Sequence, residues 1–222
     1  MSPRHHLDET TVLGWASGAL SPEMAAVAAT HFEVCRHCRS RLATAEGIGG
    51  TLLEQQQPST DDATRMPRLR EHMLAALDAH PNGRVPPRHA EATAGPDNLP
   101  RALRPYFGTS WRSLRWRWLA PGVRMIRALR TSGHALILLR IDPGMSMPLH
   151  SHGGIELTQV LAGSYDDELG HFGVGDAADL GPETLHRPVT SAGGPCVCVA
   201  ALDAPLRFPG WFARMLQPLV GL

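Results

Sequence analysis

Apolar positions in the first eighty residues recur three and four apart, which is the period of an amphipathic helix. Four such stripes follow one another, and they begin near Val12, Met24, Leu42 and Met66. Ser21 and Pro22 precede the second stripe, as an N-cap followed by proline at the first helical position. Residues 80–83 end the fourth stripe with a proline and a glycine. The pattern predicts four short helices between residues 7 and 79.

The period changes in the second half of the chain. Strand-like runs, alternating or rich in leucine and isoleucine, cover residues 114–118, 134–141 and 156–161. Glycine-containing pairs that favour turns recur every eight to twelve residues. Short strands separated by regular turns are typical of antiparallel sandwiches and barrels. We therefore expect an all-β unit in this half.

The chain divides between these two patterns. Residues 81–105 hold six prolines and two glycines with few large apolar residues, a composition that cannot bury a core. A length of 222 residues suffices for two small domains. We predict an α + β two-domain protein with a small helical bundle in residues 1–84. A linker over residues 85–108 would lead to an antiparallel, jelly-roll-like barrel in residues 109–217.

Charge and cysteine content narrow the function classes. The chain has 21 Lys+Arg against 21 Asp+Glu, so no net field draws it to nucleic acid or to an anionic membrane. It has no run of eighteen apolar residues and no apolar core of a signal peptide near its start, so we expect a cytoplasmic protein. The four cysteines form two close pairs, which in a reducing compartment favour metal or redox chemistry over disulfides.

The sharpest local signal in the first half is His31-x3-Cys35-x2-Cys38. On one continuous helix these side chains would share a face, and across a turn the two cysteines would still reach one ion. Structural zinc takes four nitrogen or sulfur ligands, so a fourth would come from His5 or His6. Two thiolates with two imidazoles suit zinc and suit Mg²⁺ or Ca²⁺ poorly.

A helical unit of about 75 residues buries a small share of its surface, so bound zinc would help it to fold. Such a bundle leaves apolar faces for a partner. The fourth stripe, over residues 66–77, lies beyond a polar spacer at residues 55–62. It would either pack as an ordinary core helix or lie on that partner.

The second half contains a larger constellation. The first motif of the cupin fold is matched at every position by Gly144-x5-His150-x-His152-x3-Glu156-x6-Gly163, and His186 follows. The paired histidines lie at strand period, so both face one side of the chain. Three imidazoles and a carboxylate would meet in the barrel and bind a divalent metal, with zinc preferred and Fe, Mn, Ni or Cu as alternatives.

Two further features of the sequence are explained by ordinary structural roles. Cys196 and Cys198 alternate in a β-rich run, and we expect a buried apolar pair rather than a redox couple. Residues 98–141 contain nine arginines and no acid, without the aromatic and basic motif of a nucleic-acid surface. A solvated barrel face or a contact to the helical domain explains those arginines equally well.

The spacing of His31, Cys35 and Cys38 among small helices is similar to the zinc-binding domain of bacterial anti-sigma factors. The flanking residues 4–6 resemble specifically the ChrR family, in which a cupin domain follows. The resemblance favours His6 as the fourth ligand. It implies that the helical domain holds an extracytoplasmic-function (group IV) sigma factor, one to one, away from core RNA polymerase. It also implies that the cupin domain permits release under oxidative stress, signalled by singlet oxygen or organic peroxide.

Three functions compete. The first is this regulator, to which we assign no catalytic residue. The second is a cupin metalloenzyme, of dioxygenase or isomerase type, with an accessory helical domain. The third, a DNA-binding repressor, lacks a helix-turn-helix signature, and residues 1–98 hold nine arginines against twelve acids. The zinc motif separates the first two, because a sensor needs an output domain and a metabolic cupin does not.

Overall fold

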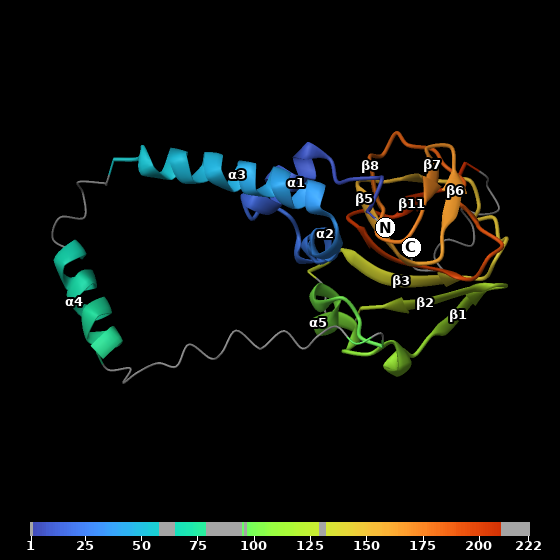
Figure 1. Ribbon diagram of the computed structural model, residues 1–222, viewed down its shortest axis with the longest axis horizontal. Helices are drawn as coiled ribbons and strands as arrows, with labels where there is room; N and C mark the ends of the chain where they lie inside the picture. The colour runs from blue at the N-terminus through green and yellow to red at the C-terminus, as the bar shows by residue number, and fades with distance from the viewer. Residues whose placement is uncertain (1, 58–64, 79–94, 96, 129–131, 210–222) are drawn as a thin grey trace.

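The structure, a computed structural model, describes residues 2–57, 65–78, 95, 97–128 and 132–209 of the chain (Figure 1). The N-terminal helices are α1 (Glu9–Ala16), α2 (Pro22–Val34), α3 (Arg36–Glu54) and α4 (Arg65–Asp78). The four predicted helices are therefore confirmed. Helix α2 begins as expected, with the Ser21 side chain accepting a hydrogen bond from Met24 N.

The rest of the described chain is mainly β-structure. Three short turns come first, η2 (Arg101–Leu103), α5 (Arg104–Phe107) and η3 (Trp111–Ser113). The strands are β1 (Arg117–Ala120), β2 (Val123–Arg127), β3 (Ala135–Ile141), β4 (Ser151–His152), β5 (Glu156–Ala162), β6 (Tyr165–Asp167), β7 (Gly170–Phe172), β8 (Ala177–Leu180), β9 (Val189–Thr190), β10 (Cys196–Leu202) and β11 (Leu206–Arg207). They form antiparallel sheets in the orders β1-β2-β3-β10-β5-β8, β7-β6-β9 and β11-β4. The expected fold class, helices followed by an antiparallel cupin barrel, is confirmed.

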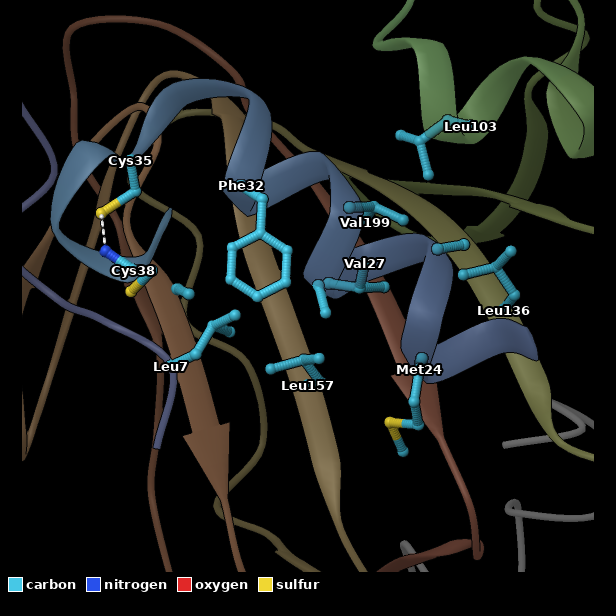
Figure 2. Close-up of a cluster of buried hydrophobic side chains, with 14 of the residues drawn as sticks. Leu7, Met24, Val27, Phe32, Cys35, Cys38, Leu103, Leu136, Leu157 and Val199 are labelled. Carbon is cyan, nitrogen blue, oxygen red and sulfur yellow. Dashed lines mark hydrogen bonds between the residues drawn. The ribbon is translucent and has the colours of Figure 1, made fainter. Parts of the chain in front are cut away.

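Helix α2 lies against the outer face of the six-stranded sheet. It contacts β3, β5 and β10. Because side chains alternate along a strand, one set faces the helix and the other faces the barrel interior. The set that joins the helix in one buried cluster includes Leu136, Leu138, Leu157, Val199 and Ala201 (Figure 2). The helical part therefore shares its core with the barrel.

A buried carboxylate adds a polar link across the same contact. Glu23, in the first turn of α2, has no exposed surface. Its two oxygens accept hydrogen bonds from Ser132 N at 2.6 Å and from Ser132 Oγ at 2.8 Å. Burial alone would raise the pKa of Glu23, but the hydrogen bonds from Ser132 outweigh burial and lower it. Glu23 is thus held as a paired carboxylate.

The second half of the expected linker differs from its prediction. Residues 97–108 are folded, and Leu99 and Leu103 are buried. The Glu33 carboxylate of α2 accepts hydrogen bonds from the backbone N–H groups of Arg101 and Ala102. Two buried leucines and one carboxylate therefore fix a segment whose proline content suggested a flexible linker. Residues 85–94 and 96 of that linker, and residues 210–217 of the expected barrel range, lie outside the described residues.

Helices α3 and α4 leave large apolar side chains exposed, and we name this set of side chains the α3/α4 apolar surface. It consists of Ile48, Leu52, Leu53, Met66, Leu69, Met73, Leu74 and Leu77. Helix α3 extends away from the sheet, and α4 stands apart from the other helices (Figure 1). Residues 66–78 are all exposed, so α4 is not a fourth core helix. None of the described helices has both the length and the apolarity needed to cross a membrane.

The shared core predicts that one substitution in the sheet will destabilise the whole described fold. Leu157→Ala removes a fully buried side chain under α2 and should lower the free energy of unfolding by about 2–5 kcal/mol. Leu53→Ala, at a position 69% exposed, is the matched control and should change it by less than about 0.5 kcal/mol. Urea unfolding followed by circular dichroism measures both. Equal effects of the two substitutions would contradict the packing.

Candidate metal centres

Four side chains from three segments meet at the end of helix α2. They are His6, His31, Cys35 and Cys38, and their candidate ligand atoms all lie within 4.8 Å of one another. We name them the His/Cys group. His31 lies in the last turn of α2, Cys38 in the first turn of α3 and His6 in the segment before α1. These four are the residues that the sequence predicted for zinc.

A break in the helix at Cys35 brings the two sulfur atoms to one point. Cys35 has extended backbone angles, φ −99° and ψ 107°, and is both the C-cap of α2 and the N-cap of α3. Its Sγ accepts a hydrogen bond from Cys38 N at 3.4 Å and lies 3.3 Å from His6 Nδ1. Of the two geometries left open by the spacing, the structure has the turn and not the continuous helix.

The orientation of His31 fits a metal ligand. Its Nδ1 lies 3.0 Å from Gly175 O, and because a carbonyl only accepts, Nδ1 donates. The lone pair is then on Nε2, which is buried without a hydrogen-bond partner. A buried polar atom without a partner is unfavourable, and a bound cation would satisfy it. Gly175 thus acts as the outer partner that usually fixes a ligating histidine.

Burial also sets the protonation of this group. Desolvation lowers the pKa of His31 to about 4 and lowers that of His6 as well, so both imidazoles are neutral near pH 7. Desolvation raises the pKa of the Cys38 thiol to about 11. The histidines are therefore ready to bind an ion, whereas Cys38 must first lose a proton.

The structure separates the two neighbouring histidines that the spacing left as alternatives. His6 belongs to the His/Cys group, whereas the His5 ring stacks on Phe172 with centroids 4.0 Å apart. His5 Nε2 also lies 3.0 Å from His171 O. His5 therefore attaches the N-terminal segment to the barrel.

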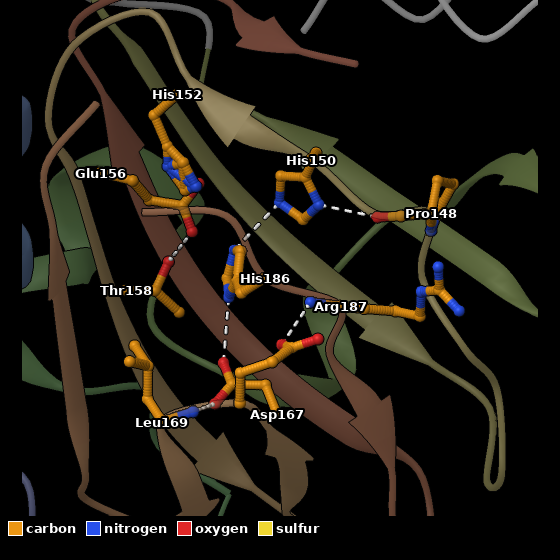
Figure 3. Close-up of polar contacts among 10 residues, drawn as sticks. Pro148, His150, His152, Glu156, Thr158, Asp167, Leu169, His186 and Arg187 are labelled. Carbon is orange, nitrogen blue, oxygen red and sulfur yellow. Dashed lines mark hydrogen bonds and ion pairs between the residues drawn. The ribbon is translucent and has the colours of Figure 1, made fainter. Parts of the chain in front are cut away.

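A second group lies inside the barrel. The ring nitrogens of His150, His152 and His186 come within 4.8 Å of one another, and we name these residues the histidine triad (Figure 3). His152 belongs to β4, and an antiparallel bridge joins His150 to His186. The two Nε2 atoms of that bridged pair are 3.2 Å apart. The paired histidines of the first cupin motif, His150 and His152, thus lie beside His186, which follows much later in the sequence.

The outer nitrogens of the triad are fixed by acceptors. His150 Nδ1 lies 2.8 Å from Pro148 O, and His186 Nδ1 lies 2.9 Å from Asp167 Oδ2 (Figure 3). Nδ1 of each histidine therefore donates a hydrogen bond, which leaves the lone pair of Nε2 available to bind a metal. Both nitrogens of His152 are buried without a hydrogen-bond partner. Burial lowers the pKa of His150 and of His152, which keeps both neutral.

Glu156 lies at the edge of this group. Its Oε2 is 3.7 Å from His152 Nδ1, while its Oε1 accepts a hydrogen bond from the Thr158 hydroxyl at 2.9 Å. The three histidines, and not the carboxylate, form the compact set. Of the four expected ligands, only the three histidines therefore lie close together. The hydrogen bond from Thr158 keeps the Glu156 carboxylate away from them.

Two residues around the groups were missed by sequence reasoning. Asp167 is fully buried beside His186, and Asp176 accepts hydrogen bonds from the N–H groups of His5 and Gly173. No motif spacing marks either of them. Cys196 and Cys198 are buried, as predicted, and lie beside each other on β10.

Comparisons with known proteins agree with this arrangement. The chain is 37% identical to "Anti-sigma-E factor ChrR" of Cereibacter sphaeroides over 98% of both chains. The chain belongs to the ChrR family. A family model described as the ChrR Cupin-like domain matches residues 107–204. The solved structure of Rhodobacter sphaeroides SigE in complex with the anti-sigma ChrR matches with a TM-score of 0.76 and 33% identity, covering 91% of this chain and 100% of that chain.

The thiol pKa in this ChrR-family chain predicts proton release on metal binding. Near neutral pH, loading the His/Cys group with a divalent ion should release at least one proton, because Cys38 is protonated until it binds. The apparent affinity should then rise about tenfold per pH unit for each proton released. Titration in weak buffer with a pH indicator measures the release.

The matched control is the double variant Cys35→Ser, Cys38→Ser, which keeps the histidine triad. Because burial keeps His150 and His152 neutral, these two ligands of the triad should release almost no proton when a metal binds there. Equal proton release by the wild-type chain and the double variant would contradict ligation through Cys38.

Proposed function

We propose that this chain is an anti-sigma factor that binds an extracytoplasmic-function (group IV) sigma factor one to one through its helical part. The observation that carries the proposal is the 98% shared coverage with a relative named as an anti-sigma factor, in a chain that retains the whole His/Cys group. A second support is the solved relative, whose complex with SigE matches across both halves of this chain.

The α3/α4 apolar surface is the proposed contact. Large exposed apolar patches on soluble proteins mark interaction sites, and this one lies on two helices that the barrel does not cover. Leu69 and Met73 are one helical turn apart on α4, as in helices that bind into a groove. When bound, this surface would cover part of the sigma factor and block its contacts with core RNA polymerase.

We propose zinc as the ion of the His/Cys group. Two thiolates and two neutral imidazoles form a closed set that suits zinc, and they join the end of α2 to the start of α3. When bound, the ion would supply the folding energy that fixes the angle between these helices. The chain's own residues orient it, since Gly175 holds His31 and Cys35 turns the backbone.

The histidine triad is the proposed sensor. Three histidines, with Glu156 nearby, would hold a second divalent metal, zinc first and Fe, Mn, Ni or Cu as alternatives. With a metal held by these residues, the barrel would sense singlet oxygen or organic peroxide and would then permit release of the sigma factor. The alternative is a cupin metalloenzyme with an accessory helical part, and measurable turnover by the barrel would favour it.

Substitutions on α4 test the partner surface. The double variant Leu69→Asp, Met73→Asp places charges in the proposed contact and should weaken binding to an extracytoplasmic-function sigma factor of the same organism at least about thirtyfold, or ~2 kcal/mol. Leu13→Asp, on exposed α1, is the matched control and should bind within about threefold of wild type. Isothermal titration calorimetry gives each affinity. Unchanged binding by the double variant would exclude this surface.

Substitutions in the barrel test the sensor. His150→Ala with Glu156→Ala should leave sigma binding within about threefold, because both residues lie inside the barrel and away from α3 and α4. Release of the sigma factor by singlet oxygen should be lost. His171→Ala, an exposed histidine paired with Asp166, is the control and should release normally. Normal release by the barrel variant would show that the triad is not the sensor.

A further inference from the structure

One ten-residue stretch, residues 167–176, contacts both candidate metal groups, and we name it the connecting segment. Asp167 Oδ2 accepts a hydrogen bond from His186 Nδ1 at 2.9 Å. Gly175 O accepts one from His31 Nδ1 at 3.0 Å. We propose that the connecting segment couples the two groups, so that a change at the histidine triad alters the affinity of the His/Cys group for its metal. This inference rests on the proposed function in requiring an ion at each group.

The start of the segment is tied to the chain around His186. The side chain of Asp167 is completely buried, and its other oxygen accepts a hydrogen bond from Leu169 N at 2.9 Å. The neighbouring Glu168 carboxylate accepts one from Arg187 N at 2.8 Å. Two consecutive acidic residues, Asp167 and Glu168, therefore hold two consecutive residues, His186 and Arg187. A shift of His186 must move this end of the segment.

The far end is tied to the N-terminal segment that carries His6. The Asp176 carboxylate accepts hydrogen bonds from Gly173 N at 2.8 Å, from His5 N at 3.0 Å and from Arg4 N. Ala177 N donates to His5 O at 3.3 Å. The turn that presents Gly175 to His31 is therefore also fastened next to His6. The positions of His31 and His6, two of the four residues of the His/Cys group, therefore depend on the position of this turn.

The middle of the segment is a short hairpin that is anchored by the buried ring of Phe172, while Leu169 and Val174 on either side are exposed. Strands β6 and β7 form an antiparallel hairpin with the pairs Tyr165↔Phe172, Asp166↔His171 and Asp167↔Gly170. The Phe172 ring stacks on Tyr165 with centroids 4.8 Å apart and on His5 at 4.0 Å. The buried Phe172 ring is the part of the segment that belongs to a packed interior, and such interiors transmit displacement. Outer hydrogen bonds of ligating histidines change metal affinity about 10- to 100-fold, which is ample for coupling.

The test uses the full-length chain without any sigma factor and uses Co²⁺ as the probe. Thiolate-to-cobalt charge transfer absorbs only where cysteine binds the ion, so this band reports the His/Cys group and not the triad. Competition with a chelator gives the cobalt affinity of that group. In wild type it should exceed the affinity in His152→Ala, which disables the triad, by about fivefold or more. Equal affinities would overturn the coupling.

Asp167 is then tested as the positioning residue in a double-mutant cycle. Asp167→Ala should lower the cobalt affinity of the His/Cys group by about fivefold or more in wild type, and by less than about twofold in the His152→Ala background. A general structural effect would persist in both backgrounds and would overturn the proposal. Asp167→Asn, which keeps an acceptor oxygen, should restore the wild-type value.

The matched control removes another aspartate–histidine contact from the same hairpin. Asp166 Oδ1 lies 2.9 Å from His171 Nδ1, at exposed positions outside both groups. Asp166→Ala should change the affinity by less than about twofold. If Asp167→Ala does not unfold cooperatively, Glu168→Ala replaces it under the same criteria. Glu168 is exposed, and its removal loosens the contact to Arg187.

Two failures of the experiment are distinguishable. Absence of the thiolate-to-cobalt band would overturn the assignment of a metal to the His/Cys group. A band whose affinity does not depend on the triad would overturn only the coupling.

Discussion

The packing of helix α2 on the outer face of the six-stranded sheet determines where both candidate metal groups lie. Val27 and Ala28 are fully buried in that contact, and the last turn of the helix brings His31 to the Gly175 carbonyl of the barrel. The helical part would bury too little apolar surface alone. The sheet supplies the additional buried apolar surface, so the stability of the His/Cys group depends on the stability of the barrel.

The break at Cys35 divides the helical part into a half that faces the barrel and a half that faces solvent. Helix α2 stays on the sheet, and α3 leaves it directly after Cys35 (Figure 1). Cys38 follows in the first turn of α3, so the His/Cys group spans the corner. An ion bound there would fix the angle at which α3 departs, because its ligands come from both helices.

Local patterns predicted the helices, the antiparallel barrel and the residues of both groups, since helix period, turn residues and ligand spacing are short-range signals. Contacts between distant residues carry no such signal. The contact of Asp167 with His186 depends on the closed barrel, and the contact of Gly175 with His31 depends on the packing of α2 on it. The burial of Leu103 was hidden for the same reason. The prolines around it suggested a linker, whereas it packs in the cluster with helix α2, which lies far away in the sequence.

The use of α2 by the barrel limits where a partner can bind. A free helical bundle would offer the apolar face of α2 to a sigma factor, but the sheet already covers that face. The α3/α4 apolar surface is what remains exposed, and it begins beyond the corner at Cys35. On the proposed coupling, a change inside the barrel would reach that surface through the end of α2, where Gly175 of the connecting segment accepts a hydrogen bond from His31. This position makes the His/Cys group the junction between the proposed sensor and the proposed contact.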